Sequence, residues 1–410
     1  MIYFNRRCNM QKLLFCNLDL LRKSFDGFDN PNLKQFRDEF LDYADTLCND
    51  AENQIYFISK DQTQLDAAEK FFNNNGYNNF KFRSRAKAKD FVMKYKSRNN
   101  FFVFISGKEV DFHLAVHSKS LFIVPTWIPV EDKSEYYGVH VDTPDQLDKF
   151  IRTLNNQESW YAKLEIEPNI TALSLMDGRY KYKAKTENER EMIMHFEALL
   201  KQGKSRNYYD ILLYHFLAGM TNTTLFDDIE LFGMIPSSNC SLNEDIFSFM
   251  TQVRYIKGKR LPKNKMEDAN LIQRITPKIQ AHMLSNQSAR ANMGADYEFD
   301  TLRINPEFKQ KIERLKKEGR FKVCIFDDYM THGNTFNAVR NLLKYLGADK
   351  IIFVSLGNFS RPFQKKDYKI TGNVFDSGYN YELLQSTQQY LTYDEDAKDE
   401  IDELYNIFNS

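Results

Sequence analysis

The sequence has few of the features that point to secreted, membrane or metal-clustered proteins. Its five cysteines are scattered and form no Cys-x-x-Cys pair, as expected of buried thiols in a cytosolic protein rather than of a disulfide framework. No apolar run approaches the roughly 20 residues of a membrane-spanning helix. The polar start at residues 5–7 is not followed by a secretory signal. These absences favour a cytoplasmic protein without a membrane partner.

Net charge is absent as well. Lys plus Arg and Asp plus Glu both number 56, so the formal net charge is zero. No global field then draws the chain to nucleic acid, and a small-molecule partner is favoured. With 410 residues and 42% hydrophobic content, the chain has material for two domains with separate cores.

The most informative segment is residues 321–335, which reads FKVCIFDDYMTHGNT. Residues 321–326 are apolar and predict a strand, and two carboxylates, Asp327 and Asp328, follow directly. Residues 327–335 are predicted to be the loop between this strand and a helix. That helix is indicated by apolar residues at helical spacing, namely Phe336, Val339, Leu342, Leu343 and Leu346.

A loop of this kind predicts a phosphate site. In an open parallel sheet it lies outside the carboxyl end of its strand, and the helix behind it presents free N–H groups and a positive dipole end. Gly333 would let the backbone approach a phosphate, while Thr331 and Thr335 would add hydroxyl donors. Asp327 and Asp328 would repel that phosphate, but they suit sugar hydroxyls or Mg²⁺.

This segment resembles the signature of the type I phosphoribosyltransferases, in which an apolar strand, an Asp-Asp pair and a Thr-Thr-Gly-x-Thr turn follow one another. His332 stands here in place of the second Thr. The resemblance implies Mg²⁺ as the cofactor, reached indirectly through the acid pair, and phosphoribosyl pyrophosphate (PRPP) as a ligand. Asp327 and Asp328 would hold the ribose hydroxyls. The 5-phosphate would lie on Thr331, His332, Gly333, Asn334 and Thr335.

An earlier turn in the same sheet is predicted to bind the pyrophosphate. Residues 229–235 predict a strand and residues 242–253 a helix, and the polar turn between them contains Ser237, Ser238 and Asn239. The turn is either an ordinary helix N-cap or an anion site.

Further downstream, residues 274–292 loosely resemble the competence-type phosphoribosyltransferases. This resemblance implies that Arg274 and Arg290, with Gln280 and Asn292 beside them, approach the pyrophosphate. A solvated basic loop is the alternative.

Transfer from PRPP would proceed through an oxocarbenium-like transition state as pyrophosphate departs. Cations would spread the charge of the leaving group, and the acid pair would stabilise the cationic ribose. Either Asp327 or Asp328 could accept a proton from the incoming nucleophile, and the sequence does not choose between them.

The N-terminal half contains apolar strands that end in polar residues, in an order that resembles the haloacid dehalogenase (HAD) superfamily. Asn17 stands where those phosphatases have a carboxylate nucleophile, and a neutral amide cannot attack phosphorus. This half is therefore expected to be catalytically degenerate. The positions that carry the resemblance are Asn17 and Asp19, Ser59, Lys87 or Lys89, and Glu109 with Asp111.

The predicted fold class is α/β, with two Rossmannoid parallel-sheet domains. Residues 1–157 would form the HAD-like domain, ending in a helix at 145–154 with Pro144 in its first turn, and residues 155–159 would be the linker. Residues 158–410 would form the phosphoribosyltransferase-like domain. Its hood, which would select the acceptor, is assigned to 160–225 and 362–410.

Three functions remain open from the sequence. The first is Mg²⁺-dependent transfer of phosphoribose from PRPP to a nucleobase-like or other nitrogen acceptor, with release of pyrophosphate. The second is a regulatory protein that binds PRPP or a nucleotide without turnover, and the third is a HAD phosphatase coupled to the transferase domain. By analogy, such fusions resemble bacterial stress or phage-defence modules. A homo-oligomer is common in the resembled family, but the sequence does not identify an interface or the acceptor.

Overall fold

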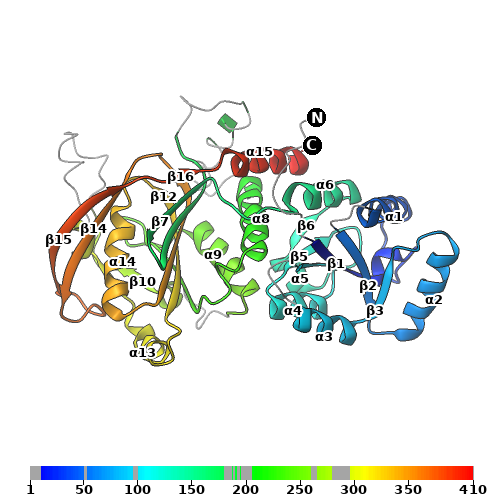
Figure 1. Cartoon of the computed structure of the whole chain (residues 1–410), viewed down its shortest axis with the longest axis horizontal. Coiled ribbons are helices and arrows are strands. Elements are labelled where there is room, and N and C mark those ends of the chain that lie inside the picture. The colour runs from blue at the N-terminus through cyan, green and yellow to red at the C-terminus, as the bar shows by residue number, and fades with distance from the viewer. Residues whose placement is uncertain are drawn as a thin grey trace.

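The computed structural model describes residues 11–49, 53–95, 100–179, 206–259, 266–278 and 296–409, with a few isolated positions between 187 and 194. Two six-stranded sheets lie side by side, each covered by helices (Figure 1). The fold class is therefore α/β, as predicted. In the described part of the chain, no helix is both long and apolar enough to cross a membrane.

The first sheet is wholly parallel, in the order β3-β2-β1-β4-β5-β6. Its central strands are buried on both faces, which explains their continuous apolar runs. Strands β2 and β3 are added on one side of β1, and β4, β5 and β6 on the other. The loops after β1 and β4 therefore lead to opposite faces of the sheet, and ligands bind in the crevice between such loops. The strands are β1 (Gln11–Asn17), β2 (Asn53–Ser59), β3 (Lys81–Ser84), β4 (Asn100–Ile105), β5 (Leu121–Pro125) and β6 (Val139–Val141).

Helices alternate with these strands. The predicted last helix is present as α6, which begins at Pro144 with the Thr143 hydroxyl accepting a hydrogen bond from Gln146 N at 3.1 Å. The helices of this half are η1 (Leu18–Leu21), α1 (Leu33–Asn49), α2 (Gln62–Asn74), α3 (Arg85–Tyr95), α4 (Glu109–Ser118), α5 (Asp132–Tyr137) and α6 (Pro144–Leu154).

The second sheet is mixed rather than wholly parallel, in the order β16-β7-β8-β13-β12-β9. The four strands β8, β13, β12 and β9 run parallel, whereas β7 and β16 are antiparallel to their neighbours. Its strands are β7 (Ala162–Glu167), β8 (Ile170–Asp177), β9 (Leu231–Met234), β12 (Lys322–Met330), β13 (Lys350–Asn358) and β16 (Thr392–Tyr393). Because β7 and β8 come from residues 160–225, part of the predicted hood belongs to the central sheet.

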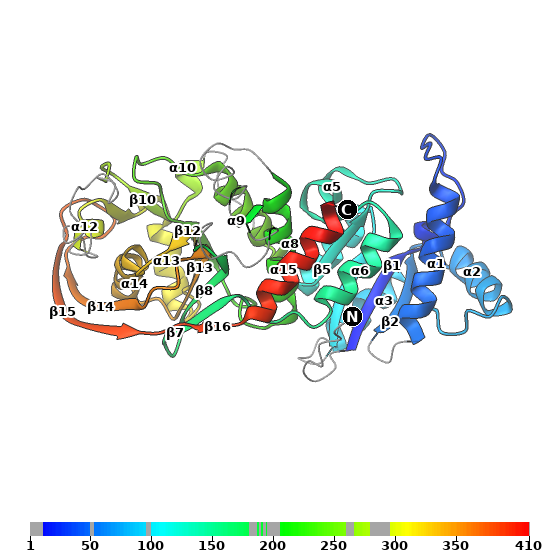
Figure 2. The ribbon, with the colours of Figure 1, turned by 90° about the horizontal axis from the view of Figure 1, so that it is seen from above.

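Two small antiparallel pairs flank this sheet. The pair β10 (Ile272–Arg274) and β11 (Leu302–Ile304) lies near the end of β9, and the long ribbon β14 (Phe363–Thr371) and β15 (Asn380–Gln389) curves around the outer side of α14 (Figure 2). The helices are α8 (Arg206–Asn222), α9 (Glu244–Ile256), α10 (Met266–Ala269), α12 (Asp296–Phe299), η3 (Pro306–Phe308), α13 (Lys309–Lys317), α14 (Asn334–Leu346) and α15 (Glu395–Asn409).

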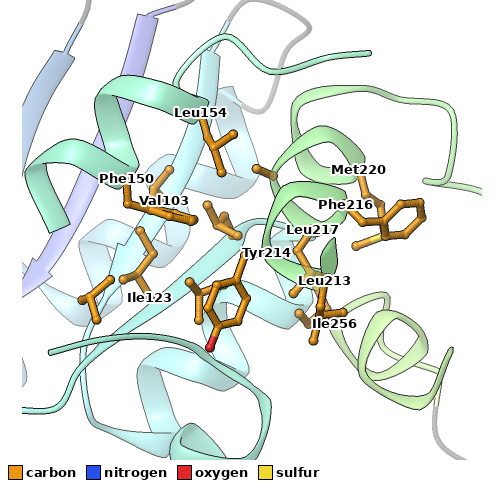
Figure 3. Packing of buried hydrophobic residues seen from close by; sticks show 14 of the residues in the cluster. Val103, Ile123, Phe150, Leu154, Leu213, Tyr214, Phe216, Leu217, Met220 and Ile256 are labelled. Carbon is orange, nitrogen blue, oxygen red and sulfur yellow. The ribbon is translucent and has the colours of Figure 1, made fainter. Parts of the chain in front are cut away.

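A continuous apolar core joins the two sheets. Side chains of α8 meet those of α6 and the first sheet, with Tyr214 and Phe150 at ring centroids 6.3 Å apart (Figure 3). The final helix α15 packs against both α8 and α6, and the ring centroids of Phe408 and Phe150 lie 6.0 Å apart. The two sheets are thus expected to move as one unit.

The predicted linker is part of this junction and not an exposed tether. Gln157 and Asn155 are buried, and the Asn222 side-chain amide at the end of α8 donates to the Gln157 carbonyl at 2.6 Å. Sequence composition cannot distinguish a buried connection of this kind from a solvated one, because polar side chains serve both.

Candidate functional site

The predicted acid pair lies at the carboxyl end of β12, between the ends of β9 and β13. Parallel pairing with β13 continues past the acids, with Tyr329 opposite Gly357 and Met330 opposite Asn358. Asp327 and Asp328 therefore lie within the strand, and the connecting loop is shorter than residues 327–335. The strand extends because its neighbour β13 is equally long, which the local sequence did not indicate.

Both carboxylates accept backbone hydrogen bonds. Asp327 Oδ1 accepts from Asp328 N at 2.9 Å, and Asp328 Oδ1 accepts from Tyr329 N at 2.6 Å. Within the described ranges, no lysine or arginine forms an ion pair with either of them. The described part of the chain thus supplies no cation to this pair of acids.

The environment of the acid pair raises the pKa values of both Asp327 and Asp328. Burial raises the pKa of Asp327 well above its ordinary value, and the adjacent Asp328 carboxylate raises it further. Asp328 remains accessible to solvent, yet protein packed around its carboxyl group displaces water and raises its pKa too. Because the two carboxyl groups interact, their protons are released in two steps that belong to the pair rather than to either residue.

The acid pair fits a divalent cation only in a limited sense. In the part of the chain that the structure describes, no group of three or more His, Cys, Asp or Glu side chains could hold a metal. Mg²⁺ is commonly held by one or two carboxylates together with substrate phosphates and water. Asp327 and Asp328 therefore suit an ion that arrives with a phosphorylated ligand.

The turn after β12 leads into α14 as predicted, although Gly333 has a different structural reason. Its φ of 73° lies in the left-handed region, and a Cβ there would be 2.0 Å from the Phe363 ring. Packing of β14 against the turn thus already requires glycine. Thr331 and His332 are exposed, and His332 Nδ1 lies 3.2 Å from the Pro362 carbonyl oxygen.

The first turn of α14 has no side-chain cap at Gly333, which leaves its N–H groups to other partners. Asn334 and Thr335 are half-buried there. The Thr335 hydroxyl does not point to open solvent, because it donates to Glu298 Oε1 at 2.9 Å.

The polar turn after β9 lies beside the acid pair, as predicted from its place in the sheet. Ile235 N donates to the Phe326 carbonyl at 2.8 Å, which fixes the turn next to Asp327. The helix N-cap alternative is wrong for Ser237, Ser238 and Asn239, because the Asn243 side chain caps α9. Within the turn, Ser237 N donates to the Ser241 carbonyl and Asn239 Oδ1 accepts from Ser241 N at 3.1 Å.

Arg274 is near this turn, as predicted, but it is buried and engaged. Its Nε donates to the Pro236 carbonyl at 3.4 Å, and its Nη2 pairs with Glu298 Oε2 at 3.1 Å. Lys278 also forms an ion pair with Glu298, and its backbone N–H donates to the Ser238 carbonyl at 2.6 Å. Arg290, Gln280 and Asn292 lie outside the described residues.

Glu298 is the main residue that sequence reasoning missed. It lies on the four-residue helix α12, is 1% exposed, and contacts Arg274, Lys278 and Thr335. Burial alone would raise the pKa of Glu298, but the two cations hold it below its ordinary value. No local motif marks this residue, because its partners come from distant segments.

Tyr329 forms a second feature of this edge that the sequence did not reveal. A Cβ at Gly357 would be 2.5 Å from the Tyr329 ring, and one at Gly178 would be 3.0 Å from it, so both glycines make room for the ring. Phe359 lies 5.0 Å from Tyr329 between ring centroids. The buried Asn358 Nδ2 beside them has no hydrogen-bond partner among the described atoms.

The N-terminal polar residues meet at the carboxyl ends of β1 and β4, with Asp111 at the centre. Asp111 Oδ2 accepts from Asn17 Nδ2 at 2.6 Å and from the Ser106 hydroxyl at 2.7 Å, while Oδ1 pairs with Arg85 Nε at 2.5 Å. Asn17, Ser106 and Asp111 are all buried. The lysine position of the HAD resemblance was assigned to Lys87 or Lys89, but Arg85 is the cation that reaches Asp111.

The remaining predicted residues lie around this cluster. Asp19 pairs with Arg22 at 2.9 Å and with Lys108 at 3.7 Å. The Ser59 hydroxyl accepts from Asp61 N at 3.2 Å, so it serves the turn after β2. Lys87 is exposed on α3.

Comparison of the chain with protein-family models, with curated proteins and with solved structures gave no match. The assignment of function therefore depends on the geometry of the two sheet edges.

Proposed function

We propose that the edge of the second sheet is the active site of a Mg²⁺-dependent phosphoribosyltransferase. The observation that carries this proposal is the acid pair, which has no ion-pair partner among the described residues and lies on the strand that leads into α14, where Gly333 supplies no side-chain cap. Asp327 and Asp328 would hold the ribose hydroxyls of PRPP, and the N–H groups at the start of α14 would hold its 5-phosphate. The leaving pyrophosphate would then extend toward the turn after β9, which lies on the adjacent strand.

The chain's own residues supply most of the catalysis in this proposal. Arg274 and Lys278 provide cations near the leaving pyrophosphate, and the acid pair stabilises positive charge that develops on the ribose. Mg²⁺, when bound, would neutralise phosphate oxygens. The raised pKa of Asp327 suits a group that takes and keeps a proton from a nitrogen nucleophile.

The aromatic residues next to the acid pair favour a planar acceptor. Tyr329 and Phe359 lie at the ends of β12 and β13 with ring centroids 5.0 Å apart, and Asn358 Nδ2 offers a donor without a partner in the described chain. A nucleobase-like ring has both a flat face and polar edges, so it matches these groups better than an aliphatic amine does.

The proposal is tested by calorimetric titration of PRPP with Mg²⁺ into the wild type and into Asp327→Asn/Asp328→Asn. The double variant is expected to lose roughly 100-fold in affinity. Asp228→Asn is the matched control, because Asp228 pairs with Lys322 and Lys350 at the opposite ends of the same strands. Equal binding by all three proteins would overturn the proposal.

Pyrophosphate release with a panel of bases separates a transferase from a regulator. Turnover with any base, lost in the double variant, supports the transferase. Tight binding without turnover supports the regulatory alternative, which the engagement of Arg274 and Thr335 by Glu298 also favours.

A HAD phosphatase coupled to the transferase is not proposed. The Asn17 amide donates to Asp111 and the Arg85 guanidinium neutralises its charge, so the carboxylate has its hydrogen bonds and counter-charge without a phosphate or a metal. Hydrolysis of a generic phosphate ester by the wild type, lost in Asp111→Asn, would reverse this view.

A further inference from the structure

A buried carboxylate lies where the proposed site needs an anion. Glu298 contacts Arg274 through Oε2, and its Oε1 accepts from the Thr335 hydroxyl and pairs with Lys278. The side chains of Arg274 and Glu298 are 3% and 1% exposed. These contacts tie the start of α14 to the segment that runs beside the turn after β9.

The partners of Glu298 are the groups that bind phosphates elsewhere. Guanidinium and ammonium groups are the usual phosphate ligands, and a hydroxyl on the first turn of a helix adds a donor beside the N–H groups. Two cations face one carboxylate here, so the cluster keeps one positive charge in excess. A second anion, or one with more charge, could therefore be accommodated.

Exchange of Glu298 for a ligand anion avoids the main cost of opening a buried ion pair. Removing one partner of such a pair is costly because the other charge is left uncompensated. If an incoming phosphoryl group replaces the carboxylate, Arg274 and Lys278 stay paired throughout. The negative charge of Glu298 also acts on Asp327 and raises its pKa, so its displacement would alter the acid pair as well.

We propose that Arg274, Lys278 and Thr335 form a binding site for a pyrophosphate-like anion, and that Glu298 occupies this site until the ligand displaces it. The identity of the ligand as PRPP rests on the proposed function. The existence of an anion site does not rest on it.

A second ion-pair cluster, which is less buried than that of Glu298, provides a control. Glu167 pairs with Arg340, Lys344 and Lys365, which also pair in part with Asp367. This cluster joins β7, α14 and β14 on the outer side of the sheet and includes no residue of the two phosphate turns. A carboxylate with several cationic partners can thus be removed there without touching the proposed site, although the Glu167 side chain is 19% exposed and that of Glu298 only 1%.

The test is binding of inorganic pyrophosphate to Glu298→Ala, Glu167→Ala and the wild type, followed by thermal unfolding and calorimetry at equal ionic strength without metal. Glu298→Ala is expected to be less stable in chloride, to regain stability with pyrophosphate, and to bind it about tenfold more tightly than the wild type. Glu167→Ala is expected to lose stability without this rescue. Glu298→Gln keeps the shape of the side chain and should show the same gain in affinity, which covers the case in which the alanine variant does not fold.

Two outcomes would overturn the inference. One is an equal response to pyrophosphate in the Glu298 and Glu167 variants, and the other is weaker binding by Glu298→Gln than by the wild type. Failure of the proposed function is recognised separately, because it concerns PRPP turnover and its loss in Asp327→Asn/Asp328→Asn. Pyrophosphate rescue of Glu298→Ala in a chain that never turns over PRPP would retain the anion site and reject the transferase.

Discussion

The two parallel-strand edges of this molecule treat their acids in opposite ways. At the first sheet, Asp111 is surrounded by Asn17, Ser106 and Arg85, which donate to both of its oxygens. At the second sheet, Asp327 and Asp328 accept only backbone N–H groups within the described residues. Two sheet edges of similar topology therefore differ: Asp111 has a cationic partner in Arg85, whereas Asp327 and Asp328 have none among the described residues.

The difference separates a structural acid from a functional one. A buried carboxylate with a cation and two neutral donors is stable without any ligand. Two adjacent carboxylates without a cation keep a mutual repulsion that a ligand, a metal or a proton would relieve, and such strained pairs are typical of functional sites. The comparison leads to opposite predictions for substitutions at the two edges.

The largest expected effect is at the neutralised edge. Arg85→Met removes the cation from Asp111, whose side chain is 0% exposed, so the free energy of unfolding should fall by about 3 kcal/mol. Urea denaturation measures this change. Lys149→Met, which breaks an exposed pair with Asp145, should cost less than about 0.5 kcal/mol. If both variants lose equally little, Asp111 is not a neutralised buried charge.

A smaller effect is expected when Asn17 is changed to the acid that the HAD resemblance calls for. Asn17→Asp replaces a donor 2.6 Å from Asp111 with a second carboxylate, which should destabilise the fold by about 2 kcal/mol. The edge would then resemble the acid pair of the second sheet, and Mg²⁺ should stabilise the variant but not the wild type. Asn17→Ala loses the same donor without adding charge, so its melting temperature should not respond to Mg²⁺. A response in Asn17→Ala would show that the metal acts elsewhere.

Much of this arrangement could be predicted from local sequence. The strand before Asp327, the glycine turn and the helix from Asn334 follow from short-range periodicity and turn chemistry. The place of the polar turn after β9 beside the acid pair followed from the expectation of parallel strands. These features depend on neighbours in the chain, which the sequence displays directly.

Long-range contacts could not be predicted in the same way. Glu298 meets Thr335 across 37 positions of the chain, and Arg85 reaches Asp111 across 26, with no pattern that links the partners. The lysine position was assigned to Lys87 or Lys89, whereas Arg85 on the same helix pairs with Asp111, and local sequence does not show which basic residue of α3 faces that acid. The place of β7 and β8 in the central sheet could not be predicted for a related reason, since β8 pairs with β13, which lies far along the chain.

The smallest expected effect concerns stability at the acid pair itself. The folded-state pKa of Asp327 is raised above its unfolded value, so the folded chain binds more protons and stability is lost as the pH rises through the folded-state pKa. Asp327→Asn cannot ionise and should be more stable than the wild type by about 1 kcal/mol at pH 7. The two proteins should become equally stable toward pH 4, where Asp327 is protonated in the wild type. Urea denaturation across this pH range measures the gap.

Asp228→Asn should show the opposite sign on the same strands. Burial opposes ionisation of Asp228, but Lys322 and Lys350 prevail and lower its pKa, so its stabilising effect is present at neutral pH and is lost as the pH falls through that lowered value. Asp228→Asn should therefore be less stable than the wild type at pH 7, with a gap that closes in acid. If Asp327→Asn behaves like Asp228→Asn, then Asp327 has a stabilising partner and the contrast between the two edges fails. If Asp327→Asn instead gains stability and loses PRPP binding, the acid pair lowers the stability of the fold and serves to bind the ligand.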